Sequence, residues 1–362
     1  MTNISLKTVD LPKPSPDQKL YKSVISAGFD AYPQRRENYN IFVNSSRNSS
    51  YLNYLPIKLD IENVSRCNFH CTMCSVSKWH KPTRARDMTM DEFKNLIDEQ
   101  YGLVEIKLQG LGEPFLSKDF IPMVKFARER DIWVRSTTNA SLLDRNDNYK
   151  EIIHADICEL QVSIDGASKG TFEKIRAGSR FEKVIANSTL LNEYASKENR
   201  HRTRAWTLVQ RDNFHELEDI VLLCAEMGFK RLTFSLDVED TAWIKTSKSH
   251  ISNIDRKDKF NLDNAWDLVD IGKNKDIEVT FWITFDKFET NMPENLCPWP
   301  FERAVISSDM RVVPCCMIAN PDIYELGDGS DFSNTWNSDT YQKFRQAHLS
   351  SDIPGICKKC YL

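Results

Sequence analysis

The 362-residue sequence has no run of about 18 apolar residues, the length that a membrane-spanning helix requires. Its first residues, MTNISLKTVDLPKPSPDQK, have no apolar core of the kind found in export signals, so we expect a cytoplasmic protein without a membrane partner. Neither sign of charge is in excess: 48 Lys and Arg stand against 52 Asp and Glu, which argues against a nucleic-acid partner. Charged residues at 28% and hydrophobic residues at 41% are ordinary globular values, so we expect neither disorder throughout nor a fibrous repeat.

Cysteine is too sparse for a disulfide scaffold, at ten residues in the chain, and no export signal points to an oxidising compartment. Reduced cysteines that cluster in sequence are more often metal ligands or catalytic thiols. Cys158 and Cys224 stand alone and are expected in the core. The other eight form two groups: Cys67, Cys71 and Cys74, and then Cys297, Cys315, Cys316, Cys357 and Cys360.

The chain changes character three times along its length. Residues 1–55 are rich in Pro and then in Asn and Ser, and we expect an irregular extension with at most one short helix, around Leu20 to Gly28. Six strand–helix steps follow over residues 56–237, a spacing that predicts a parallel sheet, most simply a partial or full β/α barrel. Residues 238–290 are expected to connect through one helix and one strand. Residues 291–362 are too few for a large core, so a bound metal cluster would stabilise them.

The first cysteine group forms a C-x3-C-x2-C pattern directly after the first expected strand. Three thiolates so closely spaced can hold three irons of one [4Fe–4S] cluster and leave the fourth iron open to a substrate molecule. A structural zinc site needs a fourth ligand, for which His70 is a candidate although it lies between two of the cysteines. Three unrelated core cysteines are the remaining interpretation.

Further segments follow the triad, each at the carboxyl end of an expected strand. They are Gln109-Gly-Leu-Gly-Glu-Pro114, Thr137-Thr-Asn-Ala140, and Ser163-Ile-Asp-Gly166 with Thr171-Phe-Glu-Lys-Ile-Arg176 behind it. Together with the triad, these segments resemble the radical SAM superfamily over about residues 56–236. They also lie where a β/α barrel places its site.

The resemblance implies a partial (β/α)6 barrel in which Cys67, Cys71 and Cys74 ligate a [4Fe–4S] cluster, and S-adenosyl-L-methionine (SAM) completes the open iron. The resemblance implies that one pair of residues holds the amino group of SAM. A second pair holds the carboxylate and the ribose of SAM, and in this pair Arg176 acts through charge-assisted hydrogen bonds. The expected SAM contacts are Gly112 and Glu113 for the amino group, Ser163 and Arg176 for the carboxylate and ribose, and in addition Asn139 and Met73.

Two residues depart from the pattern of the superfamily. Met73 stands where an aromatic residue usually lies beside the adenine, and Ala140 stands where glycine is usual. Ser163 and Asn139 also have an alternative role, because both residue types commonly cap turns.

The second cysteine group resembles the SPASM/Twitch extension of radical SAM enzymes. The resemblance implies that one auxiliary [4Fe–4S] cluster is held by four ligands, Cys297, Cys315, Cys357 and Cys360. Met310 occupies a position that is usually glycine, so we expect an altered tight turn. A zinc ribbon with the same four ligands is the alternative. Cys316 is then left over, either as an inert thiol or as a hydrogen-atom donor near the substrate.

Three functions fit these features. As in the superfamily, SAM would be cleaved with an electron from a flavodoxin- or ferredoxin-type donor, and the resulting 5'-deoxyadenosyl radical would remove hydrogen from a substrate C–H bond. Our main expectation is the two-electron oxidation of a small, sugar- or cyclitol-like substrate with the auxiliary cluster as electron acceptor, because the single-cluster extension resembles that of sugar- and cyclitol-oxidising members. The alternative is epimerisation, cross-linking or oxidation of a ribosomal peptide or natural product, with a cysteine as hydrogen donor. The third function is that of a binding module without enzyme activity, in which zinc stabilises the C-terminal segment, but such a module would not need the segment around Gly112 and Glu113.

Overall fold

The computed structural model describes residues 11–78, 85–236, 262–283 and 288–361. In these residues one sheet contains the strands β1 (Lys58–Ile61), β2 (Glu105–Leu108), β3 (Trp133–Thr138), β4 (Glu159–Ser163), β5 (Thr203–Leu208), β6 (Arg231–Leu236), β7 (Glu278–Ile283), β8 (Arg303–Ile306), β9 (Arg311–Val313) and β10 (Gly327–Asp328). Their order is β10-β9-β8-β1-β2-β3-β4-β5-β6-β7. All neighbours from β8 through to β7 pair in parallel, whereas β9 and β10 pair antiparallel.

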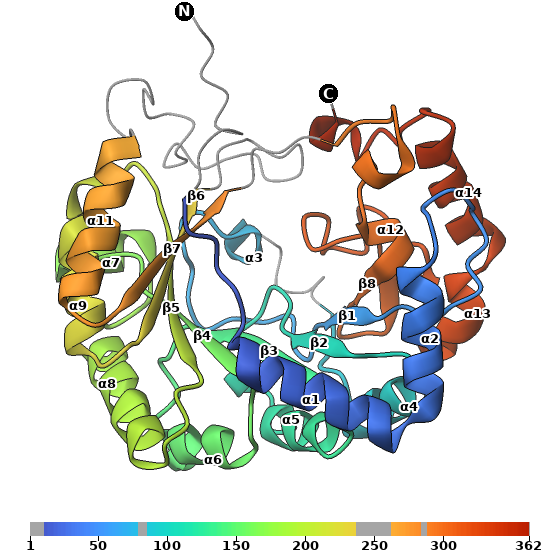
Figure 1. The fold of residues 1–362 in the computed structure, drawn as a ribbon. Coiled ribbons are helices and arrows are strands. Elements are labelled where there is room, and N and C mark those ends of the chain that lie inside the picture. The colour runs from blue at the N-terminus through green and yellow to red at the C-terminus, as the bar shows by residue number, and fades with distance from the viewer. Residues whose placement is uncertain (1–10, 79–84, 237–261, 284–287, 362) are drawn as a thin grey trace, which may run out of the picture.

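The parallel strands curve into a partial barrel with helices on its outer side (Figure 1). This confirms the expected fold class, and strands β1 to β6 are the six that the sequence predicts. The structure adds two strands that the six-step pattern leaves out. β7, expected in the connecting segment, continues the sheet beside β6, and β8, expected only in a hairpin, pairs with β1. Within the described residues β7 and β8 do not pair with each other, so the barrel stays open between them.

The helices of the described residues are α1 (Gln18–Ala31), α2 (Pro33–Val43), α3 (Ser75–Lys78), α4 (Met90–Glu99), α5 (Phe120–Arg128), α6 (Asn148–His154), α7 (Lys169–Ile175), α8 (Phe181–Lys197), α9 (Leu217–Glu226), α11 (Leu262–Asn274), α12 (Trp299–Glu302), α13 (Phe332–Trp336) and α14 (Asp339–Leu349). Short 3-10 turns lie at Pro114–Leu116, Arg145–Asp147, Phe214–Glu216, Pro293–Asn295, Gly329–Asp331 and Lys358–Cys360. In these parts of the chain, no helix combines the length and apolar character needed to cross a membrane.

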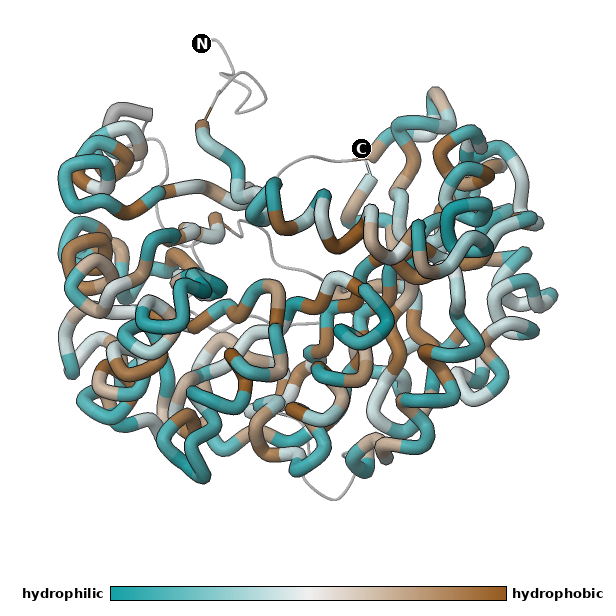
Figure 2. Tube along the Cα trace, turned by 60° about the horizontal axis from the view of Figure 1, so that its bottom comes forward, coloured by the Kyte–Doolittle hydropathy of each residue, from teal (hydrophilic) through white to brown (hydrophobic). Residues whose placement is uncertain are grey.

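Helix α4 shows how the local sequence sets an element. Thr89 and Glu92 form the expected capping box: the Glu92 backbone N–H donates to the Thr89 hydroxyl, and the Thr89 backbone N–H donates to the Glu92 carboxylate. Phe93, Leu96 and Ile97 then share one buried face at helical spacing. The outer helices generally turn hydrophobic residues toward the sheet and hydrophilic residues outward (Figure 2).

The strands alternate between an apolar outer face and a polar inner one. Leu59, Ile106 and Leu160 on the outer face are fully buried beneath the helices. Successive residues of a strand point to opposite faces of the sheet, so Asp60, next to Leu59, and Lys107, next to Ile106, face the lumen of the barrel. A barrel with a polar lumen leaves room there for a site, rather than filling it with a hydrophobic core.

Residues 1–55 contradict the expectation of an irregular extension with at most one short helix, because helices α1 and α2 lie there. Asp17 caps α1, with its carboxylate accepting from the Leu20 N–H, and the edge-to-face rings of Tyr21 and Trp133 pack α1 on β3. Helix α2 shows no apolar periodicity because its two buried residues are polar. Arg35 donates to the backbone oxygens of residues 101, 130 and 131, and Asn38 exchanges two hydrogen bonds with the backbone of residue 55.

Candidate active site

The cysteine triad lies on the loop that follows β1, at the carboxyl ends of the parallel strands. The loop is fixed by hydrogen bonds from the backbone N–H of His70 to the oxygen of residue 177 (2.7 Å) and of residue 72 to that of residue 175 (2.9 Å). Cys67 and Cys74 are half-buried, Cys71 is buried, and all three thiols are free. Burial raises the pKa of Cys71 to about 11, and the three thiols influence one another electrostatically, as expected for cysteines on one short loop. Bringing three such groups together as thiolates requires a compensating cation, which iron supplies.

The loop after β2 packs directly on the triad loop. A Cβ atom added at Gly112 would lie 2.2 Å from the backbone oxygen of Val64 and 2.5 Å from that of Arg66, so only glycine allows this approach. The Glu113 N–H also donates to the Arg66 oxygen, at 3.0 Å. Residues 64 and 66 lead straight into Cys67, so the two loops form one structural unit.

The carboxylate of Glu113 points toward the loop after β3. It accepts from the Thr138 hydroxyl (2.7 Å), the Asn139 backbone N–H (2.7 Å) and the Phe115 N–H (3.4 Å). Burial raises its pKa to about 7. Glu113 thus ties the loops after β2 and β3 together, a role that the sequence analysis did not assign to it.

The other expected SAM contacts gather at the same end of the barrel. The Asn139 amide nitrogen lies 3.9 Å from the Cys67 sulfur, and Arg176 Nη1 lies 4.0 Å from the Cys71 sulfur. Ser163 is the last residue of β4. Met73 lies in the cysteine loop directly before Cys74, is half-buried and packs against the hydrophobic core.

Two acidic residues that the sequence analysis assigned no role hold this end of the barrel together. Asp165, fully buried, forms an ion pair with Arg176 at 2.7 Å and accepts from the backbone N–H of residue 208. The Arg176 guanidinium therefore has a carboxylate partner from the protein itself. Glu216 accepts from the Ala167 N–H and the Thr171 hydroxyl and anchors the start of α7. An acidic residue within two residues of the end of a strand, as at Asp165, is the signal that could have revealed the first of these.

The second cysteine group also comes together in space. The thiols of Cys297, Cys357 and Cys360 influence one another electrostatically, and Cys315 is influenced by Cys297. The Tyr361 hydroxyl accepts from the Cys297 N–H at 2.9 Å, which joins the two ends of this segment. Within the described residues, no three His, Cys, Asp or Glu side chains converge tightly enough to hold a single metal ion.

The turn before Cys315 corrects one expectation. Met310 adopts a φ of +66°, the left-handed conformation that glycine favours, and its N–H donates to the Ser307 oxygen at 2.9 Å. The tight turn is therefore formed, not altered, although methionine replaces glycine. Ala140 behaves in the same way, with a φ of +61°.

Cys316 follows Cys315 directly in the chain, and its thiol acts electrostatically on that of Cys315. The charged groups that act on the Cys316 thiol are Asp60, Lys107, Arg135 and Arg303, and all four lie on strands of the barrel. The residue is exposed. Cys315 is also influenced by Cys297, whereas the charged groups that act on Cys316 belong to the barrel.

The opposite end of the lumen is closed by a buried network of charges, which we call the floor. Glu105 pairs with Lys58 (3.3 Å) and Arg135 (2.9 Å), and a second carboxylate nearby pairs with two arginines. That second set consists of Glu159 with Arg204 (3.3 Å) and Arg231 (3.1 Å). Among the described residues, this network occupies the end of the lumen opposite the cysteine triad.

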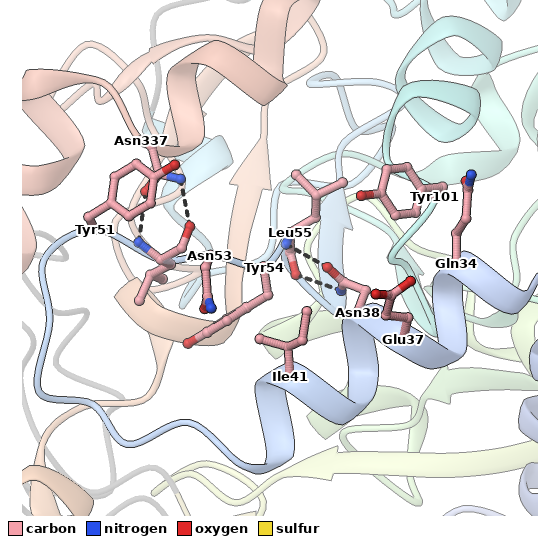
Figure 3. A pocket seen from close by; sticks show the side chains of 11 residues that line it. Gln34, Glu37, Asn38, Ile41, Tyr51, Asn53, Tyr54, Leu55, Tyr101 and Asn337 are labelled. Carbon is pink, nitrogen blue, oxygen red and sulfur yellow. Dashed lines mark hydrogen bonds between the residues drawn. The ribbon is translucent and has the colours of Figure 1, made fainter.

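A separate groove of about 550 Å³ lies on the outside of the molecule, between α2, residues 51–55, Tyr101 and Asn337 (Figure 3). Its walls are held by paired hydrogen bonds, of Asn38 with Leu55 and of Asn337 with Leu52. None of its lining residues is a cysteine or an expected SAM contact, so we place the chemistry in the lumen.

Comparison with known proteins agrees with this geometry. Residues 63–224 match the radical SAM superfamily, and residues 297–361 match SPASM, an iron–sulfur cluster-binding domain. The class is that of SAM-dependent radical enzymes with an α/β barrel. The chain belongs to the radical SAM superfamily and carries a C-terminal SPASM domain. Its cofactors are accordingly SAM, a [4Fe–4S] cluster and an auxiliary iron–sulfur centre, which disfavours the zinc interpretations.

Among curated proteins, the PqqA peptide cyclase of Bradyrhizobium diazoefficiens is 22% identical over 318 residues, which cover 84% of this chain and 79% of the relative. A Pyrococcus furiosus protein described as modifying the cofactor of tungsten-containing aldehyde ferredoxin oxidoreductase is 24% identical, over 84% of this chain and 87% of its own.

Two solved structures share the fold. SuiB of Streptococcus suis bound to S-adenosylmethionine has a TM-score of 0.61 at 16% identity, over 80% of this chain and 68% of SuiB. The enzyme anSMEcpe with AdoMet and a peptide bound has a TM-score of 0.58 at 21% identity, over 84% of this chain and 86% of that one.

Proposed function

We propose that this radical SAM enzyme modifies a peptide, and that Cys67, Cys71 and Cys74 ligate the SAM-binding [4Fe–4S] cluster. The observation that carries the cluster assignment is the gathering of these thiols beside the loop of Gly112 and Glu113, at the open end of the barrel. When bound, the cluster and SAM together supply a 5'-deoxyadenosyl radical that removes a hydrogen atom from an unactivated C–H bond.

The peptide substrate is supported by the relatives rather than by a residue of this chain. One curated relative is named a peptide cyclase, SuiB has been solved with its precursor peptide SuiA, and anSMEcpe has been solved with bound peptides. These comparisons favour our alternative expectation over the sugar- or cyclitol-like substrate, which rested on the single auxiliary cluster.

The surrounding residues of this chain take the following parts in the proposal. Gly112 lets the loop after β2 approach the cluster loop, and Glu113 fixes that loop to β3. Asn139, Ser163 and Arg176 face the SAM pocket, and Met73 lies beside the adenine. The floor at the other end of the lumen supports the barrel through buried ion pairs and takes no part in binding SAM or substrate.

The C-terminal segment, residues 291–362, forms the auxiliary domain in this proposal. Cys297, Cys315, Cys357 and Cys360 hold one auxiliary [4Fe–4S] cluster. The remaining boundaries are an N-terminal extension at residues 1–55, the barrel at 56–237 and a connecting segment at 238–290. A flavodoxin- or ferredoxin-type protein supplies electrons.

Cys316 is the proposed hydrogen-atom donor, because it is exposed and the charged groups that act on its thiol lie on strands of the barrel. Its S–H bond breaks as a new C–H bond forms on the substrate radical. One electron from the donor protein and one proton then restore the thiol. This step gives an epimerised product without net oxidation.

The test uses the anaerobically reconstituted protein with dithionite and SAM. The wild type is expected to hold roughly eight iron and eight sulfide per chain and to form 5'-deoxyadenosine, and Cys71→Ala to form none. Cys224→Ala is the matched control, since this thiol is fully buried in the core. Deuterium should reach 5'-deoxyadenosine from deuterated peptides and not from deuterated sugars. Transfer from sugars would reinstate the small-molecule substrate, and a wild type that neither binds SAM nor cleaves it would contradict the proposal.

A further inference from the structure

Glu62 follows β1 directly and connects two loops that are far apart in sequence. Its carboxylate accepts from the backbone N–H of Leu111 at 2.8 Å and from that of Ser308 at 3.3 Å. Leu111 lies between Gly110 and Gly112 in the loop after β2, residues 110–113, which we call the SAM-side loop. Ser308 lies in the turn between β8 and β9, more than 240 residues away from Glu62 in the chain.

The carboxylate is held on all sides. The side chain is buried, with 3% of its surface exposed. A Cβ atom at Gly110 would lie 2.2 Å from Glu62 Cγ, so the SAM-side loop closes directly over the side chain. The backbone N–H of Glu62 donates to the oxygen of Ile306 at 2.8 Å, which continues the pairing of β1 with β8. Neither loop can shift without breaking a hydrogen bond to a buried carboxylate, whose cost is large because no water replaces it.

The β8–β9 turn leads to the residues that matter in the auxiliary domain. It runs from Ser307 to Met310, and β9 then delivers Cys315 and Cys316 within three residues of its end. On the other side, the SAM-side loop contacts the backbone that enters Cys67. A single carboxylate therefore lies between the SAM pocket and the hairpin that carries the auxiliary ligand and the lumen thiol.

We propose that Glu62 is a positioning residue that fixes the SAM-side loop, residues 110–113, relative to the β8–β9 turn. This inference rests on the proposed function for the identity of the SAM pocket. Together with the pairing of β1 and β8, Glu62 fixes the distance between the SAM-side loop and the turn that precedes Cys316. Loss of the carboxylate loosens both loops and weakens SAM binding.

The experiment compares Glu62→Gln, in which one oxygen acceptor becomes an N–H donor, with the control Glu105→Gln. Glu105 is also a buried carboxylate, but it lies in the floor, at the start of β2, whereas the SAM-side loop follows the end of β2. Amide hydrogen exchange is measured on the reconstituted holoenzyme without SAM. Exchange should rise about tenfold or more in the segments that contain Leu111 and Ser308 for Glu62→Gln, and in neither for Glu105→Gln. Unchanged exchange in either segment of Glu62→Gln would refute the proposed coupling of the two loops through Glu62.

SAM affinity is measured on the same samples from the change in the EPR spectrum of the reduced cluster as SAM is added. Glu62→Gln should raise the dissociation constant about tenfold and Glu105→Gln less than twofold. Faster exchange with unchanged SAM affinity would make Glu62 merely structural and refute the proposal. Should Glu62→Gln fail to fold, Glu62→Asp replaces it, because the shorter side chain keeps the charge but cannot reach both N–H groups. A wild type that binds no SAM would refute the proposed function, whereas the exchange result tests the Glu62 link separately.

Discussion

Replacing Gly112 by alanine tests the packing of the SAM-side loop on the cysteine loop. The new Cβ atom would lie 2.2 Å from the Val64 oxygen and 2.5 Å from the Arg66 oxygen, and both are backbone atoms that cannot rotate away. To reach even 3.0 Å, one loop must move by at least about 0.8 Å. Overpacking of this kind destabilises a protein by about 1–3 kcal/mol. A misplacement of about 1 Å at a site can also cost about 100-fold in rate.

Gly170→Ala is the matched control, because a Cβ atom at Gly170 meets no atom within 4 Å and the residue lies in helix α7. Alanine is favoured over glycine in helices by up to about 1 kcal/mol, so this variant should be as stable as the wild type or more so. Both variants are compared by anaerobic thermal unfolding, iron content and the rate of 5'-deoxyadenosine formation.

For Gly112→Ala we expect a melting temperature about 2–6 °C lower and a SAM cleavage rate lower by about 100-fold. A loss of stability with normal cleavage would mean that the two loops do not have to be in register for catalysis. Normal stability and normal cleavage together would refute the close approach of the loops itself.

Three further predictions concern stability. Glu159→Gln leaves Arg204 and Arg231 buried without their counter-charge and should lower the free energy of unfolding by about 3–5 kcal/mol in urea titrations; a loss below about 1 kcal/mol would mean that the floor is well solvated. Thr89→Ala removes the N-cap of α4 and should cost about 1 kcal/mol in the same assay, and no loss would contradict the cap. Burial raises the pKa of Glu62 from 4.5 to about 7, so the folded state holds a proton that the unfolded state has lost; Glu62 should lower wild-type stability by about 3 kcal/mol as pH rises from 4.5 through 7, in addition to a similar contribution from Glu113, and Glu62→Gln should lack the Glu62 part of this pH dependence.

The sequence predicts the six central strands because each is a short apolar run followed by a helix with a visible apolar face. It does not predict α2, whose buried residues Arg35 and Asn38 are held by hydrogen bonds to backbone atoms and give no hydrophobic period. It also misses the pairing of β8 with β1. That pairing joins residues about 245 positions apart, and no local pattern encodes which distant edge a strand will meet.

The candidate site also has features that the sequence predicts and features that it does not. That Cys67, Asn139 and Arg176 meet could be expected, because the carboxyl ends of neighbouring parallel strands lie at one end of the barrel. Which group each side chain contacts there depends on the packing of loops. The pairing of Arg176 with Asp165, and the set of barrel residues that act on the Cys316 thiol, follow from tertiary contacts that spacing does not carry.

Ala140 and Met310 show what kind of departure from a family pattern the fold can absorb. Both replace glycine, yet both hold a left-handed backbone, at a cost of about 1–2 kcal/mol each. The conformation persists because the surroundings fix it: Ala140 N–H donates to the Thr138 hydroxyl and its oxygen accepts from Asn187, while the Met310 oxygen accepts from the Gly329 N–H. These two positions require a left-handed backbone conformation, and neighbouring residues can impose that conformation on a residue other than glycine. Met73 is a departure of a different kind: in the proposed site its side chain, and not its backbone, stands where an aromatic ring is usual, and a neighbouring residue that fixes the backbone cannot supply a missing ring.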